Sequence, residues 1–548
     1  GPNHISSLYF PEAWARILSW TAAATAAMEA LRAGLPFAAP ATLVITQLEM
    51  PVWARGCIWD CADPDHCVPA TPSHAATQHP GRQLDASSLR RFAAELGIED
   101  FDIVDQAERG VESRSECSLT TTLAFHHKGL QQNLQPALKV IAADEREQWV
   151  RAAGVLLPYV PTRSLARNVL MQARQRVLPD GTVEDYEKPR VSTDESDSAS
   201  DDSPNAGIPA DETTLGLPTS VDFAGGLATV GVAFGGISRA GAYAVDLESA
   251  FRFVVLQLLD LWMHVFLWWD STGRVVFFVD LRMSFGGAVG PNRFQRIMRI
   301  VRAYVARRQR TFDLAQPPPA VALDWEQHRR RLQAAGQLTP AAEQSHPQYL
   351  QVFIDDLNGA SGVDHCIVPP ELERHVIDHS PLAITGGTAL PRASRATVHC
   401  LLAIDTLLMA CLAVSGGKTQ CADIVVSLGF RASTRGAGRL DVPPQKASVI
   451  IHSVAAHREL VQARSPIPFG PLEKLVGRLC HVAQIYCAIR LWLHAGYALL
   501  RARFRRGGAR RPFLPAVRLR PGGRRERELL RLRRSPRLRR AGSSRCAT

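Results

Sequence analysis

Apolar and polar residues alternate along the chain in two distinct ways. Short apolar runs typical of strands occur in "GAYAVDLE", "GRVVFFVDLR", "LQVFIDD" and "ADIVVSLGF". Longer segments carry apolar residues at helical spacing, among them "PNRFQRIMRIVRAYVARR" and "RATVHCLLAIDTLLMACLAV". Because the two kinds of segment do not follow a strict strand–helix–strand rhythm, the pattern predicts an α+β fold.

The same pattern divides the chain into regions. Residues 1–150 are Ala-rich and mainly helical in pattern, and one helix is expected to be capped by Ser87 or Ser88 and closed by Gly97. An acidic segment of small residues, 192–214, predicts a solvated linker. A Pro-rich insertion, 315–347, contains one expected helix from Trp325 to Ala335. A helical region follows the mixed core, with one apolar helix face formed by Leu472, Leu475, Val476, Leu479 and Val482.

Composition adds an uneven charge distribution to this picture. The 548 residues are 46% hydrophobic and 21% charged, which is ordinary for a globular protein. The net charge is +11, but residues 501–548 contain 18 arginines and two glutamates, a net +16, which leaves −5 for residues 1–500. The Arg-rich tail has little apolar material. We expect it to be disordered and to contact nucleic acid non-specifically, unless it is a low-complexity end without a role.

Two further features bear on location. The long apolar stretches 251–269 and 396–414 are interrupted by charged or His residues, so they predict buried elements and not membrane spans. Eleven scattered cysteines and an N-terminus without a secretory signal pattern favour a reducing intracellular location, cytoplasmic or nuclear. One cluster could form a zinc knuckle, but its spacing favours ordinary thiols; it contains Cys57, Cys61, His66 and Cys67.

The candidate chemistry starts at "YLQVFIDDLNGASG", where an apolar run ends on Asp355 and Asp356. Successive side chains on a strand point to opposite faces, so both carboxylates can lie together only at a turn, which we expect within "DDLNGASG". Adjacent carboxylates repel each other unless a cation lies between them, and such oxygen ligands favour Mg²⁺ or Mn²⁺. A second Asp-Asp pair, 201–202, shows that the dipeptide alone proves little.

A metal site needs a third carboxylate from another strand. Asp246 and Asp280 each follow an apolar run. Asp246 is followed by Glu-Ser-Ala-Phe, whereas Asp280 runs into a Gly-rich turn that leads to a helix. This context favours Asp246, with Asp280 as its rival. For Asp246 and Asp355 the alternative is a turn or capping carboxylate.

Taken in order, these segments resemble the motifs of reverse transcriptases. Asp246–Phe251 resembles motif A, D-x-x-x-A-[YF], "SFGGAVGPNRFQRI" resembles motif B, and "FIDD" resembles motif C. "GGKTQCADIVVSLGF" resembles motifs D and E, and "YEKPRVSTD" resembles a strand of the fingers. "PPQKASVI" and "LEKLVGRLCHVAQIYCAIR" resemble the thumb of polymerases from LTR or tyrosine-recombinase retroelements. Each motif is weak alone, but their order is specific. Phe353 and Ser284 depart from the usual Tyr and Pro.

The resemblance covers about residues 150–497 and implies a right-hand polymerase fold. Fingers are then expected at 151–245, a palm with an antiparallel sheet at 246–430, and a helical thumb at 431–500. Residues 1–150 become an N-terminal extension of unknown role, and 501–548 the basic tail. No segment resembling an RNase H, integrase or protease domain is recognisable.

The resemblance also implies a metal-dependent mechanism. Asp246 and Asp355 would bind two Mg²⁺ ions, with Mn²⁺ as a possible substitute. The main-chain carbonyl of Leu247 would complete one ion's ligands, and Asp356 would support the other two carboxylates. Lys418 is expected to be the acid for the leaving pyrophosphate.

The remaining site residues are expected to hold the nucleotide. Lys188 and Arg190 would bind the triphosphate, with a solvated loop as the alternative. Phe251 would exclude the 2′-hydroxyl of ribonucleotides, with a core aromatic as the alternative. Gly286 and Gly287 would allow the backbone to approach the template–nucleotide pair.

These implications predict an RNA-directed DNA polymerase that adds dNTPs to a primer on an RNA or DNA template. One alternative is a decayed or co-opted retroelement remnant that only binds nucleic acid. Another is an RNA-dependent RNA polymerase, which Phe251 disfavours because that enzyme must accept the 2′-hydroxyl.

Overall fold

The computed structural model describes residues 11–45, 57–58, 83–118, 120–155, 157–177, 183–196, 202–337, 347–373, 375, 392–463, 465–486, 489–490, 493, 497 and 513–514. The chain forms two compact units, Gly1–Arg439 and Leu440–Thr548. Strands and helices mix in the first unit as the α+β pattern predicts.

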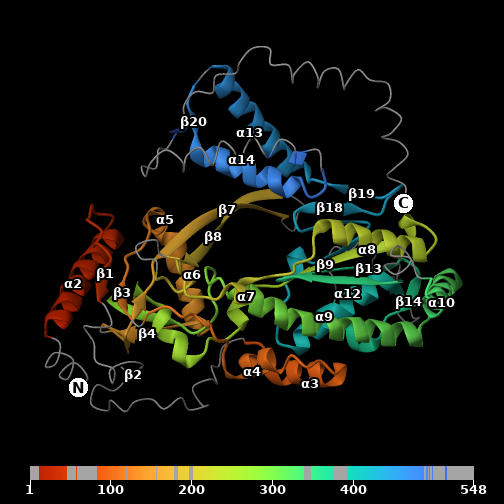
Figure 1. Ribbon diagram of the computed structural model, residues 1–548, viewed down its shortest axis with the longest axis horizontal. Helices are drawn as coiled ribbons and strands as arrows, with labels where there is room; N and C mark the ends of the chain where they lie inside the picture. Colours follow the sequence, from red (N-terminus) through yellow and green to blue (C-terminus); the bar gives the residue numbers. More distant parts are fainter. Residues whose placement is uncertain are drawn as a thin grey trace. The chain divides into compact units, whose positions relative to one another are not determined.

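A four-stranded antiparallel sheet lies at the centre of the first unit (Figure 1). Its strands run in the order β12 (Tyr349–Phe353), β13 (Asp356–Gly362), β9 (Ala240–Asp246) and β16 (Gln420–Ala422). Three helices pack against it: α8 (Ser220–Ala233), α9 (Gly290–Ala315) and α12 (Arg395–Met409). Because β12 is at the edge of this sheet, its outer backbone groups face α9 and not another strand.

The first unit also contains a six-stranded sheet. Its order is β1 (Leu43–Ile45), β3 (Thr121–Leu123), β6 (Arg163–Ser164), β10 (Val265–Trp269), β11 (Val275–Asp280) and β4 (Val150–Gly154). The expected boundary at residue 150 therefore does not separate two compact parts. Strands from the supposed N-terminal extension pair in register with later strands, as at Thr122 and Arg163.

A long two-stranded ribbon follows β6 in the chain (Figure 1). It consists of β7 (Arg167–Val177) and β8 (Val183–Thr193), paired over their whole length. Lys188 and Arg190 lie on β8, opposite Gln172 and Leu170. The prediction that both basic residues lie on a strand is confirmed, and their spacing of two places them on one face.

The helix expected to be capped by Ser87 or Ser88 begins before both residues, at Ala86. Helix α3 (Ala86–Leu96) is capped by Asp85, whose carboxylate accepts from the Ser87 backbone N at 3.0 Å. The expectation that Ser87 or Ser88 caps the helix is wrong, because a carboxylate already fills that role. Gly97 ends the helix with a φ of 64°, as predicted.

Several shorter elements complete this unit. The helices are α2 (Pro11–Ala33), α4 (Phe101–Arg109), α5 (Lys128–Gln132), α6 (Leu134–Arg146), α7 (Ala210–Thr213) and α10 (Ala320–Ala334). The remaining strands are β2 (Cys57–Ile58), β5 (Tyr159–Val160), β14 (His365–Ile367), β15 (Arg392–Ser394), β17 (Ile424–Ser427) and β18 (Phe430–Ser433). Strand β19 (Arg439–Asp441) spans the boundary between the units. The helix expected from Trp325 starts at Ala320.

The acidic segment 192–214 is not a solvated linker in its described part. Glu195 is buried and accepts from Ser284 Oγ at 2.6 Å. Asp202 accepts from the Ser118 backbone N at 2.8 Å and pairs with Arg163 at 2.8 Å. The expectation of a solvated linker fails because these carboxylates bind donors of the folded core.

The second unit contains the expected helical region. Helices α13 (Pro444–Gln462) and α14 (Phe469–Val482) pack together beside β20 (Ile467–Pro468), which pairs with β21 (Phe513–Leu514). The predicted apolar face of α14 is confirmed, with its buried members at Leu472, Leu475, Val476 and Val482. Apart from Phe513 and Leu514, the Arg-rich tail lies outside the described residues.

Two further expectations concern membrane-spanning segments and the possible zinc cluster. Within the part of the chain that the structure describes, no helix has the length and apolarity needed to cross a membrane. Of the possible zinc cluster, Cys57 lies on β2, while Cys61, His66 and Cys67 lie outside the described residues.

Candidate active site

Three carboxylates lie at one end of the four-stranded sheet. Asp246, the last residue of β9, is the direct cross-strand partner of Asp356, the first residue of β13. Phe353 and Asp356 are also partners, so Ile354 and Asp355 form the two-residue turn between β12 and β13. Residues 110 positions apart in the chain are thus neighbours, because directly opposed side chains of an antiparallel pair are about 5 Å apart.

The turn lies at the start of "DDLNGASG" and not among its small residues, because it consists of Ile354 and Asp355. The rest of the segment, Asp356–Gly362, is strand β13, and its glycines have a packing role instead. A Cβ on Gly359 would lie 2.2 Å from Tyr243 Cζ, and one on Gly362 would lie 2.2 Å from Phe234 Cε1. The small residues therefore leave room for two buried aromatic rings and do not indicate a turn.

The turn is held in a strained conformation by a buried side chain of α9. Ile354 has a φ of 55°, which is unfavourable for a β-branched residue. The carboxamide of Gln295 holds it: Oε1 accepts from Ile354 N at 2.6 Å and Nε2 donates to Val352 O at 3.0 Å. Gln295 is 2% exposed. Sequence reasoning assigned it no role, although it stands in "PNRFQRI".

The carboxylates of the hairpin share a partly buried environment with excess negative charge. Burial raises the pKa of Asp355, and Asp246 adds to the shift, while Lys418 and Arg190 oppose it. Burial, then the charges of Asp355 and Asp246, raises the pKa of Asp356 to about 7. Such mutual repulsion is relieved by a cation placed among the carboxylates.

In this structure Asp246 is paired with the ammonium group of a lysine. Lys418 Nζ donates to Asp246 Oδ2 at 2.5 Å, although 172 positions separate the two residues. The loop that carries Lys418 is fixed to the end of β9, because Ser415 N donates to Asp246 O at 2.8 Å. The short helical turn Gly416–Lys418 then aims the lysine at the carboxylates.

The main chain beyond Asp246 is also held by this loop. Leu247, which is buried, forms an isolated antiparallel bridge with Val414. The hydrogen bonds of that bridge are Ser415 N to Asp246 O and Glu248 N to Ala413 O. The Leu247 carbonyl is therefore not used by the bridge, which is compatible with its predicted role as a ligand.

Aromatic rings connect Phe251 to the ribbon that carries the basic residues. Phe251 packs edge-on against Phe285 at 5.3 Å and Phe294 at 5.6 Å between ring centroids. Arg190 Cζ lies 5.4 Å from the Phe285 ring centroid. Phe251 is half-buried, so the structure accommodates both its alternatives, a core aromatic and a residue facing a sugar.

The Gly-rich turn packs tightly against the chain itself. Gly286 has a φ of 146°, and a Cβ there would lie 2.0 Å from Thr193 O. The neighbouring Phe285 O accepts from Thr193 N at 2.9 Å. At Gly287 a Cβ would approach Glu195 Oε2 to 3.0 Å. The close backbone contact is thus with the end of β8, and an approach to a template–nucleotide pair stays a prediction.

Asp280, the rival of Asp246, belongs to a buried ionic network. Its carboxylate pairs with Arg252 Nη1 at 2.7 Å and with Arg167, and its exposed fraction is 0%. Burial alone would raise its pKa, but these two guanidinium groups hold the pKa of Asp280 below its ordinary value. Arg252 also pairs with Asp144 at 2.8 Å. Asp280 is therefore a structural carboxylate without access to a metal ion.

The carboxylate oxygens of the hairpin are suitable ligands for a divalent cation, but their positions in this structure do not form a closed metal site. Carboxylate oxygens are the ligands that Mg²⁺ prefers. Among the described residues, however, no three His, Cys, Asp or Glu side chains converge closely enough to form a metal site. Lys418 is bound to Asp246 Oδ2 in this arrangement, so its ammonium group neutralises part of the charge that a metal ion would meet.

Comparisons with known proteins return weak structural similarities. No protein-family profile and no curated protein matches the sequence. A foamy viral protease–reverse transcriptase in complex with double-stranded DNA shares 12% identity over 81% of this chain, with a TM-score of 0.38. The same kind of protein in complex with an RNA/DNA hybrid shares 13% identity over 78% of this chain, with a TM-score of 0.36. The chain spans 59% and 38% of their lengths. The site therefore rests on the side chains described above.

Proposed function

We propose that the protein is an RNA-directed DNA polymerase of an LTR-type or tyrosine-recombinase-type retroelement, which adds dNTPs to a primer 3′ end. One observation carries the proposal: Asp246 and Asp356 oppose each other across two strands, with Asp355 in the adjoining turn. The raised pKa of Asp356, about 7, supports the proposal that this site binds a cation.

In this proposal the carboxylates bind the metal. Asp246, Asp355 and the Leu247 carbonyl would hold it, and Asp356 would support them. When bound, two Mg²⁺ ions, or Mn²⁺ in their place, would activate the primer hydroxyl and stabilise the charge on the leaving pyrophosphate. Lys418 would release Asp246 and donate its proton to the pyrophosphate.

The neighbouring residues would bind and select the nucleotide. Lys188 and Arg190 would neutralise the triphosphate, and the effect of Arg190 on the Asp355 carboxyl supports the position of Arg190 beside the site. Phe251 would lie against the sugar and disfavour a 2′-hydroxyl. Gly286 and Gly287 would shape the floor on which the base pair rests.

Under the same proposal, elements of the fold correspond to the palm, fingers and thumb of a polymerase. The sheet β12-β13-β9-β16 with its helices would be the palm, the β7–β8 ribbon part of the fingers, and α13 with α14 the thumb. The basic tail would contact template or product through phosphate charges alone.

A primer-extension assay tests the proposal. The purified chain is incubated with a poly(rA)/oligo(dT) template and either dTTP or UTP, with Mg²⁺ or Mn²⁺. We expect dTTP incorporation that disappears in Asp355→Asn and Asp246→Asn, with folding unchanged. UTP incorporation would point to an RNA polymerase. Template binding without extension by the wild-type chain would point to a catalytically inactive remnant.

A further inference from the structure

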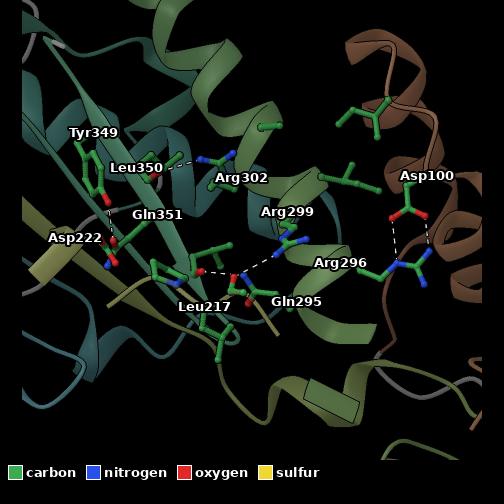
Figure 2. A pocket seen from close by; sticks show the side chains of 16 residues that line it. Asp100, Leu217, Asp222, Gln295, Arg296, Arg299, Arg302, Tyr349, Leu350 and Gln351 are labelled. Carbon is green, nitrogen blue, oxygen red and sulfur yellow. Dashed lines mark hydrogen bonds and ion pairs between the residues drawn. The ribbon is translucent and has the colours of Figure 1, made fainter. Parts of the chain in front are cut away.

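A groove lies along the outer edge of β12, and its lining includes Val352 and Gln295, which hold the hairpin turn. Its volume is about 700 Å³, which is within the range of pockets for drug-sized ligands. Figure 2 shows its walls: α9 on one side, β12 on another, and the segment around Leu217 that leads into α8. Ile98 and Asp100, just before α4, close the far end.

Two arginines of α9 face this groove without a carboxylate partner. Arg299 Nη2 donates to Gly216 O at 3.2 Å, and Arg302 Nη1 donates to Leu350 O at 3.2 Å. Within the described residues, neither guanidinium group forms an ion pair. Burial lowers the pKa of Arg302, Tyr349 opposes this shift, and the charges of Arg299 and Arg310 add to it.

The carboxylates of the groove are already engaged elsewhere. Asp100 binds Arg296 through two hydrogen bonds, at 3.1 Å and 2.5 Å. Asp222 caps α8, where it accepts from Thr219 N at 2.6 Å and Thr219 Oγ1 at 2.8 Å. Arg296 therefore has a neutralised charge, whereas Arg299 and Arg302 are available for an external anion.

A buried amide provides a third donor. Gln351 is 4% exposed and lines the groove, and its Oε1 accepts from Tyr349 Oη at 2.7 Å. Its Nε2 has no hydrogen-bond partner among the described residues. A buried donor without a partner costs about 1–3 kcal/mol, so an acceptor atom on a ligand would relieve this cost.

We propose that the groove binds a small organic anion, a phosphate or carboxylate group carried on an apolar body. Arg299 and Arg302 bind the anionic group, and Gln351 Nε2 donates to an acceptor of the ligand. The apolar body packs against Leu217, Pro218, Ile300 and Leu350, which also line the groove. The proposal does not depend on polymerase activity.

Equilibrium dialysis of the full chain with naphthalene probes tests this proposal. The probes are 1-naphthyl phosphate, 1-naphthoate and the neutral 1-naphthol, which share the apolar ring and differ in charge. We expect saturable binding of at least one anion at one site per chain, and at least tenfold weaker binding of 1-naphthol. The tighter of the two anions distinguishes a phosphate ligand from a carboxylate ligand. Equal binding of all three probes, or no saturable binding, would overturn the proposal.

Matched variants locate the binding. Arg299→Gln and Arg302→Gln should each weaken anion binding about tenfold or more, because each removes a charge-assisted hydrogen bond. Arg296→Gln, on the same helix and in the same groove, should change it less than about twofold, because Asp100 already neutralises that arginine. Circular dichroism confirms that each variant is folded. Equal weakening by all three variants would refute the assigned site.

Discussion

The Gln295 carboxamide holds the backbone of Ile354 at 2.6 Å and so fixes the turn that presents Asp355. This contact joins α9 to the hairpin in the way that a third strand would, since β12 has no further neighbour in its sheet. The strained φ of Ile354 is thus maintained by a side chain from a distant part of the sequence.

Replacement of Gln295 should reduce kcat by more than the accompanying loss of folding stability explains. Gln295→Ala leaves Ile354 N without its acceptor and frees the turn, so we expect about 1–3 kcal/mol lower stability and at least tenfold lower kcat. Urea unfolding and primer extension measure the two effects. Gln309→Ala is the matched control, because this buried glutamine of α9 donates to Tyr243 Oη and His399 O and does not bond the Ile354–Asp355 turn. Equal specific activity in both folded variants would contradict the proposed role of Gln295.

Asp356 should make the metal-free protein less stable as the pH rises. Its folded pKa of about 7 is above the ordinary value of 3.8, so between these values the folded state holds a proton that the unfolded state has lost. Stability from this group is present below pH 4 and is lost as the pH rises through 7, by at most about 4 kcal/mol. Thermal unfolding from pH 4 to pH 8 should show this loss in the wild-type chain and a smaller one in Asp356→Asn.

Added Mg²⁺ should reverse this loss at pH 8 if the carboxylates bind the ion. A cation that binds only the folded state raises its stability by mass action. We expect millimolar Mg²⁺ to raise the Tm of the wild-type chain but not that of the Asp246→Asn, Asp355→Asn double variant. An identical rise in both proteins would assign the ion to another place.

The two strand-end aspartates should differ sharply when each is changed to Asn. Asp280→Asn leaves Arg167 and Arg252 buried without their shared partner, which should cost about 3–5 kcal/mol. Asp246→Asn removes a partly exposed pair with Lys418, so we expect little loss of stability but complete loss of primer extension. Denaturant unfolding beside the activity assay checks both. Retained activity in Asp246→Asn would contradict the metal assignment.

Gly286 should tolerate no side chain. In Gly286→Ala the Cβ would meet Thr193 O at 2.0 Å, so the turn or the end of β8 must shift, and we expect a loss of more than about 2 kcal/mol. Gly225→Ala is the control, because this exposed glycine lies within α8 with open space around its Cβ position. It should gain about 0.5–1 kcal/mol. Thermal unfolding of both variants gives the comparison.

Phe251 should determine sugar selectivity under the proposed function. Phe251→Val shortens the side chain between Phe285 and Phe294 and removes the expected clash with a 2′-hydroxyl. We expect the dTTP to UTP ratio of kcat/KM to fall at least tenfold. Phe253→Leu changes a fully buried neighbour and should leave the ratio unchanged. An unchanged ratio in Phe251→Val would leave Phe251 as a packing residue.

Local pattern was sufficient to predict several elements that form the site. The strands that end at Asp246 and Asp280, the helix after the Gly-rich turn and the apolar face of α14 follow from periodicity within one segment. The pairing of Lys418 with Asp246 was not predicted, although the resemblance had placed both residues in the site.

The errors arise where a distant partner decides the structure. Gly359 and Gly362 indicate a turn locally, but the rings of Tyr243 and Phe234 require small residues there. Asp202 reads as part of a linker, yet it binds Ser118 across 84 positions. Asp280 was a plausible metal ligand until its buried arginines were known. No sequence window contains such partners.

The position of β4 in the six-stranded sheet has a consequence for synthesis on the ribosome. Among the described strands its partner is β11, and about 120 residues separate Gly154 from Val275. At roughly 5–20 residues per second, β4 remains without a partner for about 6–24 s after it is made. During that interval the nascent chain has an exposed strand edge, so we expect its yield in cells to depend on chaperones that bind before residue 280 emerges.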